Sequence, residues 1–119
     1  IEDGERIKDV TVENVLFTYD SFQIAPVEIA KIEKVAAYMK ENARVRLVAE
    51  GNCDERGSRE YNMSLGEQRA LAVRAHLIGL GIEADRIQTK SYGKEKPLEQ
   101  GHNEAAWSKN RRVEFALYR

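Results

Sequence analysis

The chain has 119 residues, a formal net charge of −1 at pH 7, 42% hydrophobic residues and 33% charged residues. This length and composition are typical of one globular domain, and they exclude a disordered or membrane-embedded chain. Residues 86–119 carry eight basic and four acidic side chains, an excess too small to indicate a nucleic-acid partner. The single cysteine, Cys53, excludes an internal disulfide.

The first part of the chain predicts a strand, a helix and a second strand. Apolar residues alternate over most of residues 10–17, which indicates a strand. Pro26 is typical of the first position of a helix, and apolar residues then recur at helical spacing until Asn42, where we expect the helix to end. The largely apolar run 45–50 predicts a strand in the interior of a sheet.

A polar loop and a second helix follow. Residues 51–63 are polar, and a loop of this length between a strand and a helix is often functional. Ser64 and Glu67 have the spacing of a capping box, which predicts that the helix begins directly after the serine. We expect the helix to end at Gly79 or Gly81, of which Gly81 is the better left-handed cap.

The last third of the chain predicts two strands separated by a surface loop and a short helix. Residues 87–93 alternate in character and predict the third strand, and an asparagine caps a short helix over residues 103–107. Residues 113–117 alternate cleanly and predict the last strand. The predicted domain covers residues 10–119. The acidic, unpatterned residues 1–9 are expected to form a flexible lead.

One charged residue interrupts the apolar face of the second predicted helix. At about 100° per residue, one arc of that helix contains Leu65, Ala72, Val73, His76, Leu77 and Leu80. Arg69 lies within this arc, and a buried arginine without a hydrogen-bonded partner costs several kcal/mol. Asp54, in the loop that leads into the helix, is the nearest candidate partner. The two residues are either an internal salt bridge or two parts of a binding site.

Four ordered motifs carry a family resemblance. They are GNCDERG at 51–57, YNxxL at 61–65 followed by Arg69-Ala70, SYGKEKP at 91–97 and NRRVE at 110–114. In this order and spacing the chain resembles the OmpA-like peptidoglycan-binding domains, most closely the branch of the peptidoglycan-associated lipoproteins (Pal), over residues 12–118. The chain departs from the family at Asn52, where histidine is usual.

The resemblance implies an α+β fold. This is a two-layer sandwich of order β-α-β-α-β-β, with a mixed four-stranded sheet and two main helices on one face. It also implies a ligand, the stem peptide of peptidoglycan, held at meso-diaminopimelate, whose side chain ends in an ammonium and a carboxylate on one carbon. By resemblance, Asp54 accepts from the ammonium and Arg69 pairs with the carboxylate, a bidentate fit that lysine lacks. The same resemblance assigns ligand contacts to Asn62, Arg111 and Gln23.

We therefore expect a binding module and not an enzyme. No motif joins His76 or His102 to a nucleophile, and Cys53 stands without further ligands at metal-site spacing, so no catalytic residue, metal or cofactor is expected. The resemblance implies a protein on the periplasmic face of the Gram-negative outer membrane, held by an N-terminal lipid anchor outside this sequence. Such a protein tethers the membrane to peptidoglycan and binds the periplasmic β-propeller protein of the Tol system, TolB. The alternative is the wall-anchoring domain of an OmpA-type porin or of a flagellar stator protein.

Overall fold

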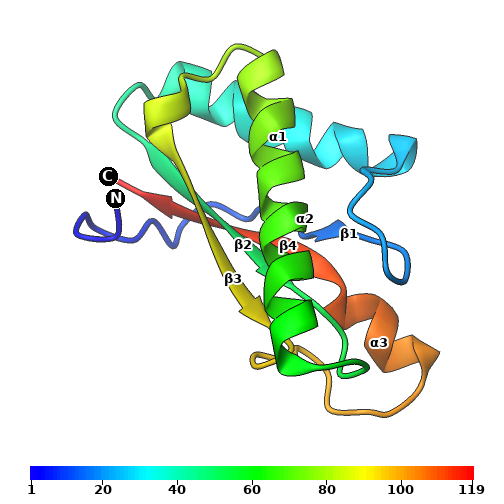
Figure 1. Ribbon diagram of the computed structural model, residues 1–119. Helices are drawn as coiled ribbons and strands as arrows, with labels where there is room; N and C mark the ends of the chain where they lie inside the picture. The colour runs from blue at the N-terminus through cyan, green and yellow to red at the C-terminus, as the bar shows by residue number, and fades with distance from the viewer.

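The computed structural model describes residues 1–119 as one mixed sheet with its main helices on one side (Figure 1). Its elements in chain order are β1 (Val15–Leu16), α1 (Ile29–Glu41), β2 (Arg46–Asn52), α2 (Arg59–Gly79), β3 (Ile87–Gly93), α3 (Glu104–Asn110) and β4 (Arg112–Tyr118). Single 3-10 turns precede α1 and β3, at Pro26–Glu28 and Ala84–Arg86. The strand order is β1-β4-β2-β3. Strands β2 and β3 are parallel, whereas β4 runs antiparallel to β1 and β2.

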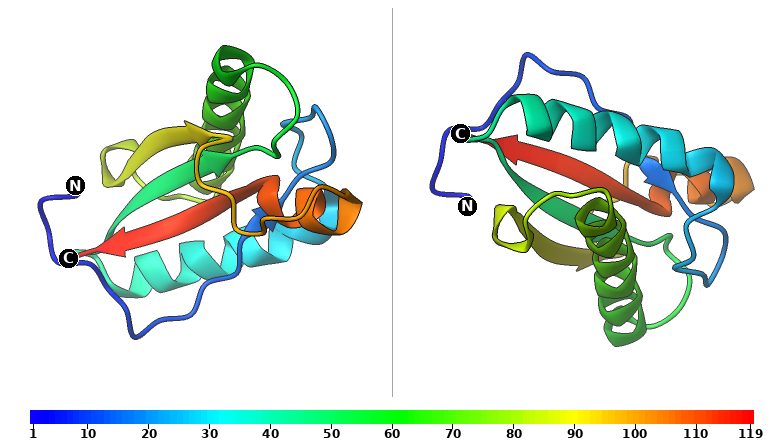
Figure 2. Two further views of the ribbon diagram at one scale, coloured as in Figure 1. Left: turned by 90° about the horizontal axis from the view of Figure 1, so that it is seen from below. Right: turned by 90° about the horizontal axis from the view of Figure 1, so that it is seen from above.

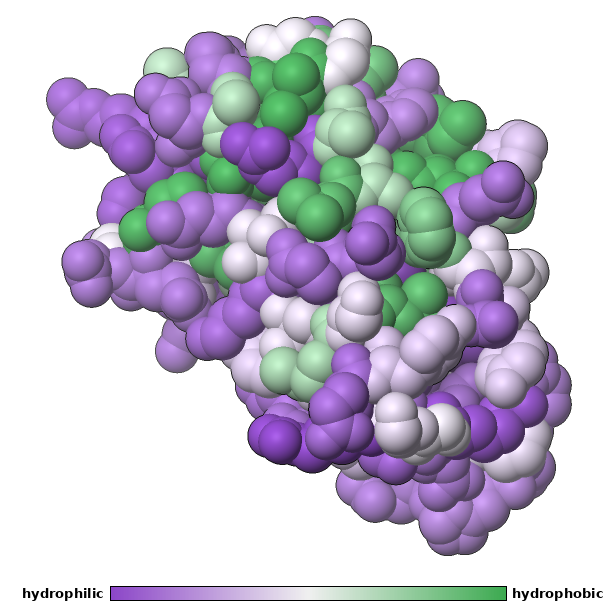
Figure 3. Space-filling view, viewed as in Figure 1, coloured by the Kyte–Doolittle hydropathy of each residue, from purple (hydrophilic) through white to green (hydrophobic).

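Helices α1 and α2 pack against the same face of the sheet, and the predicted fold class is confirmed. One continuous core contains Ile32, Val35, Ala36 and Met39 of α1, Ala70, Val73 and Leu77 of α2, and Val15, Leu47, Ala49, Ile87, Val113, Phe115 and Leu117 of the strands. These residues recur at helical spacing in the helices and at alternate positions in β2 and β4, as hydrophobic periodicity predicts. The outer surface of the helices is mostly hydrophilic, with separate apolar patches (Figure 3). No helix combines the length and apolar character that a membrane span requires.

The two termini lie side by side at one end of the sheet (Figures 1 and 2). The N-terminal lead is hydrogen-bonded to the end of β4 and to the C-terminal residue. The Ile7 amide donates to the Leu117 carbonyl at 2.8 Å, and Glu5 and Arg119 form two backbone hydrogen bonds with each other. The Ile7 side chain belongs to the core, whereas the mobility expected for the lead stays a prediction. The loops after β1 and β2, together with α3, gather at the opposite end of the molecule (Figure 1).

Helix α2 begins at Arg59, so the predicted start after Ser64 is wrong. Ser58 is the N-cap, and its hydroxyl accepts a hydrogen bond from the Tyr61 amide at 3.1 Å. Gly57 turns the chain immediately before the cap with a φ of 95°, a conformation that glycine adopts without strain. No proline or glycine lies between Ser58 and Ser64, so the helix forms from the earlier cap. The loop after β2 is correspondingly shorter than predicted.

The other boundaries differ less from the predictions. Strand β1 contains only two residues, and Val10 and Val12 of the longer predicted strand instead pack against the core without a strand partner. Gly81 has a φ of 102° and serves as the left-handed residue after α2, as predicted. Asn103 caps α3 by accepting from the Ala106 amide at 3.1 Å, and the helix continues three residues beyond the predicted end to Asn110.

Helix α2 crosses the end of β2 at close range because both elements carry a glycine there. A Cβ atom on Gly51 would lie 1.8 Å from the carbonyl oxygen of Gly66, and one on Gly66 would lie 2.3 Å from Ser91 Oγ. Side chains at these positions would push the helix away from the sheet. The two glycines therefore hold the first half of α2 against the carboxyl end of β2, which brings Arg69 close to the loop after β2.

Candidate binding site

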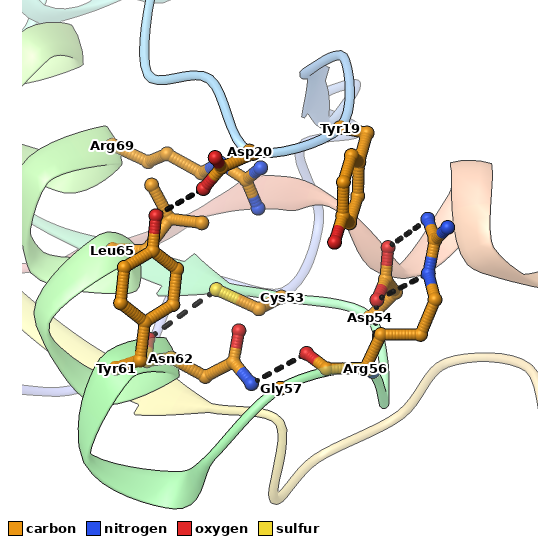
Figure 4. Close-up of a pocket in the computed structure, with 10 residues that line it drawn as sticks. All are labelled: Tyr19, Asp20, Cys53, Asp54, Arg56, Gly57, Tyr61, Asn62, Leu65 and Arg69. Atoms are coloured by element: carbon orange, nitrogen blue, oxygen red, sulfur yellow. Dashed lines mark hydrogen bonds and ion pairs between the residues drawn. The ribbon is translucent and has the colours of Figure 1, made fainter.

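A pocket opens where the loop after β1, the loop after β2 and the first turns of α2 meet (Figure 4). It has a cavity volume of about 40 Å³ and is lined by Tyr19, Asp20, Cys53, Asp54, Arg56, Gly57, Tyr61, Asn62, Leu65 and Arg69. Three of the five predicted site residues, Asp54, Asn62 and Arg69, line this pocket. The structure therefore brings together in one place residues that lie on a loop and on a helix in the sequence.

Arg69 is the most deeply buried charge of the pocket, with 1% of its surface exposed. Its guanidinium donates to three backbone carbonyls, those of Ser21 at 2.8 Å, Asn52 at 2.9 Å and Thr18 at 3.2 Å. Of the two alternatives left open for Arg69 and Asp54, the internal salt bridge does not form. Burial lowers the pKa of Arg69, although a guanidinium keeps its charge in proteins. Because arginine has five N–H groups and three are used here, two remain for a ligand.

Asp54 is also buried, with 3% of its surface exposed, and it pairs with two other arginines. Arg56 approaches it with Nη2 2.8 Å from Oδ2 and with Nε 3.2 Å from Oδ1, and its backbone amide donates to Oδ1 at 3.0 Å. Arg111 Nη1 lies 3.4 Å from Oδ2. Burial acts to raise the pKa of Asp54, but the hydrogen bonds from Arg56 and Arg111 outweigh burial and hold that pKa below its usual value.

Arg111 supports Asp54 from behind and does not line the pocket. Its guanidinium forms a fork with Glu104 at 3.0 and 2.8 Å and donates through Nε to the Phe17 carbonyl at 2.8 Å. The pair with Glu104 raises the pKa of Arg111. Gln23, the remaining predicted contact, lines a neighbouring groove that it shares with Arg111. Arg111 thus contacts the pocket through Asp54, whereas Gln23 lies in the neighbouring groove.

Asn62 fixes the loop between β2 and α2. Its side-chain amide donates to the carbonyls of Arg56 at 2.8 Å and Ser58 at 3.0 Å. The backbone carbonyl of Asn62 accepts a hydrogen bond from Cys53 Sγ at 3.3 Å. Burial raises the pKa of Cys53 to about 11, so this residue is a neutral thiol at pH 7. Asn52, which departs from the family pattern, lies outside the pocket and donates through its side chain to the Glu50 carbonyl at 3.0 Å.

Seven of the ten lining residues were not among the predicted site residues, and Tyr19, Asp20, Arg56 and Tyr61 are four of them. The Tyr61 hydroxyl donates to the Asp20 carboxylate and so joins α2 to the loop after β1 (Figure 4). Arg56 contacts two rings, with its guanidinium carbon 4.0 Å from the centre of Tyr19 and 3.9 Å from that of Trp107. Only the position of Arg56 in the same short loop as Asp54 could have indicated its role.

The charged groups in and behind the pocket balance each other. They are three carboxylates and three guanidinium groups, those of Asp20, Asp54, Glu104, Arg56, Arg69 and Arg111. A site with no net charge but with buried groups of both signs suits a small ligand that also carries both signs. No histidine or ionised thiol lines the pocket, and its charged groups of both signs can bind and orient such a ligand.

The fold and the pocket together define an α+β ligand-binding domain of the OmpA type. The chain matches the family model described as OmpA family over residues 16–111, and it belongs to that family.

Within the family, the chain is similar to peptidoglycan-associated lipoproteins. It is 44% identical over 102 residues to that of Haemophilus influenzae, covering 86% of this chain and 67% of the relative. With that of Pseudomonas aeruginosa it shares 45% identity over 99 residues, covering 83% and 58%. The chain thus covers 67% of the length of the first of these lipoproteins and 58% of the length of the second.

Solved structures agree with this assignment. The crystal structure of the peptidoglycan-associated lipoprotein from Burkholderia pseudomallei has a TM-score of 0.85 and 39% identity, covering 87% of this chain and 88% of that one. The C-terminal domain of Helicobacter pylori MotB has a TM-score of 0.84 at 23% identity, covering 92% and 86%, a similarity that establishes the fold alone.

Proposed function

We propose that this domain binds peptidoglycan without catalysis, through the meso-diaminopimelate residue of the stem peptide. The observation that carries the proposal is Arg69, a fully buried guanidinium that faces a pocket, has no carboxylate partner in the chain and retains two unused N–H groups. A buried charge of this kind is stabilised when an anion binds beside it. A ligand carboxylate would be that anion.

The end group of diaminopimelate also carries an ammonium, and Asp54 is the buried carboxylate on the same pocket wall. Its lowered pKa keeps it ionised at neutral pH, so it can accept from a cation. A ligand that presents both charges on one carbon adds no net charge to a site that is already balanced. Neither a simple amine nor a simple carboxylate meets both requirements.

The family relationship supports the biological part of the proposal. The relatives named above are peptidoglycan-associated lipoproteins, and that name describes a lipid-anchored protein in contact with the wall. We infer that the full protein lies on the periplasmic face of the outer membrane, tethers this membrane to the wall, and binds the β-propeller protein of the Tol system. The second candidate is the wall anchor of a flagellar stator, which the likeness to MotB favours at the level of the fold.

Sedimentation with purified sacculi tests the proposal. The domain is expected to co-sediment with sacculi that contain diaminopimelate and to release no soluble fragment from them over several hours. A domain that stays in the supernatant would contradict wall binding. New reducing ends or free stem peptides would contradict the non-catalytic assignment. Binding to the purified Tol β-propeller separates the two biological roles, because a stator anchor is not expected to bind it.

A further inference from the structure

The hydrogen-bond acceptor positions of the Asp54 carboxylate are already occupied by donors of the protein itself. A carboxylate offers about four lone-pair positions. Oδ1 accepts from the backbone amide and Nε of Arg56, and Oδ2 accepts from Nη2 of Arg56 and Nη1 of Arg111. Figure 4 shows the two side-chain bonds from Arg56 to this carboxylate. A ligand ammonium therefore cannot bond to Asp54 until one arginine withdraws.

The two arginines differ in how firmly they are held. Arg111 has 6% of its side chain exposed and is fixed by the Phe17 carbonyl and by both oxygens of Glu104. Arg56 has 32% of its side chain exposed, and its guanidinium donates only to Asp54. Arg56 also lines the pocket, whereas Arg111 does not. A ligand that enters the pocket thus meets Arg56 first.

Two aromatic rings lie within cation–π distance of the guanidinium of Arg56. The ring centres of Tyr19 and Trp107 are 4.0 and 3.9 Å from its central carbon. A cation near two rings is attracted to both, and these contacts tolerate sliding because they are not directional like hydrogen bonds. The guanidinium can therefore leave the carboxylate of Asp54 while it remains against a ring.

We propose that Arg56 occupies the ammonium position on Asp54 in the unliganded protein and must be displaced by the ligand. The inference rests on the proposed function, because it takes the ammonium of diaminopimelate as the displacing group. Arg56 acts as an internal competitor: it raises the concentration at which any ammonium ligand binds. Arg69, which meets the ligand carboxylate, sets the preference among such ligands.

Calorimetric titration with a synthetic stem peptide that ends in meso-diaminopimelate tests this role. The apparent affinity of a ligand is reduced in proportion to the fraction of protein that is competent to bind it. Because Arg56→Gln lacks the competing arginine, this variant is expected to bind the peptide about 3- to 10-fold more tightly than the wild type. The matched control is Arg59→Gln, since Arg59 is exposed, pairs with Glu95 and lies outside the pocket. Its affinity is expected to equal that of the wild type.

The fluorescence of Trp107, the single tryptophan of the chain, gives a second and independent readout. Displacement of Arg56 from Asp54 changes the charge next to the indole, so emission of the wild type is expected to change as the peptide binds and to change much less in Arg56→Gln. Binding by the wild type with weaker or equal binding by Arg56→Gln would overturn the inference, since Arg56 would then only position Asp54. Unchanged Trp107 emission in a saturated wild type would also overturn it. No binding by the wild type would instead refute the proposed function, and this inference with it.

Discussion

The ion pairs of Asp54 predict a loss of stability when its charge alone is removed. In Asp54→Asn the Arg56 amide keeps its acceptor, and Arg111 keeps Glu104 and the Phe17 carbonyl. The side chain of Arg56 loses its only anionic partner. Loss of charge-assisted hydrogen bonds at one buried carboxylate is expected to cost about 2 kcal/mol, or roughly 6–10 °C in melting temperature for a chain of this size.

The pH dependence of this loss checks its cause. The pKa of Asp54 is lowered in the folded protein, so its ionised form contributes stability above the unfolded-state pKa of about 4. That contribution is lost as the pH falls through the lower folded-state pKa. We therefore expect urea unfolding to separate wild type and Asp54→Asn at pH 7, and the difference to be smaller at pH 2, because Asp54 takes up a proton as the pH falls through its folded-state pKa.

An exposed aspartate provides the control. Asp85 lies in the 3-10 turn before β3 and is exposed, so Asp85→Asn is expected to change the free energy of unfolding by less than about 0.5 kcal/mol at either pH. Equal stability of Asp54→Asn and wild type at pH 7 would refute the reasoning. A difference in the free energy of unfolding of the same size at pH 7 and at pH 2 would refute it too, because such a difference would not depend on the charge of Asp54.

Two further predictions concern the fold that supports the pocket. Gly51→Ala places a Cβ atom 1.8 Å from the Gly66 carbonyl oxygen and is expected to destabilise the domain by about 3 kcal/mol or more. In the control variant Gly79→Ala the new Cβ atom meets no neighbouring atom, so this variant should be neutral or slightly stabilising. Similar urea midpoints for the two variants would contradict the close crossing of α2 and β2. Ser58→Ala removes the observed cap of α2 and should lower the free energy of unfolding by about 1 kcal/mol. Ser64→Ala should lower it little, because Ser64 is exposed within the helix. A larger loss of stability in Ser64→Ala than in Ser58→Ala would indicate that α2 begins after Ser64.

The comparison of sequence and structure is most instructive at α2. Periodicity predicted its buried face because Val73 and Leu77 share one arc. The start was missed because Ser58 and Ser64 are both good caps, and only Ser64 has an acidic residue three positions later. The local capping signal therefore favoured the wrong serine, and uninterrupted helix-forming residues allowed the longer helix.

The site shows a different limit of sequence reasoning. The burial of Arg69 followed from its place on an apolar arc, and burial of an arginine requires partners. The partners are backbone carbonyls of two separate segments, and every residue carries a carbonyl, so no sequence pattern marks them. Arg69 was the nearest candidate partner of Asp54 in the sequence, but Asp54 pairs with Arg56 of its own loop and with Arg111. Arg111 lies 57 residues away in the chain, and the pairing of β4 with β2 brings it close.

If Arg69 recognises the carboxylate at the end of diaminopimelate, the domain must discriminate between ligands that have this carboxylate and ligands that lack it. Stem peptides of the lysine type keep the ammonium but lack that carboxylate, and amidated diaminopimelate neutralises it. Loss of a charge-assisted contact in a buried site should weaken binding by about 2–4 kcal/mol, or roughly 30- to 1,000-fold.

The measurement is calorimetric titration of the wild-type domain with the three peptides at one salt concentration. Arg69→Lys should bind the diaminopimelate peptide less tightly because a point charge cannot form the fork. Arg74→Lys, whose arginine donates to backbone carbonyls outside the pocket, should bind it like the wild type. We expect tight binding of the diaminopimelate peptide alone. Equal affinities for all three peptides would contradict recognition of the carboxylate by Arg69, even if the domain still sedimented with the wall.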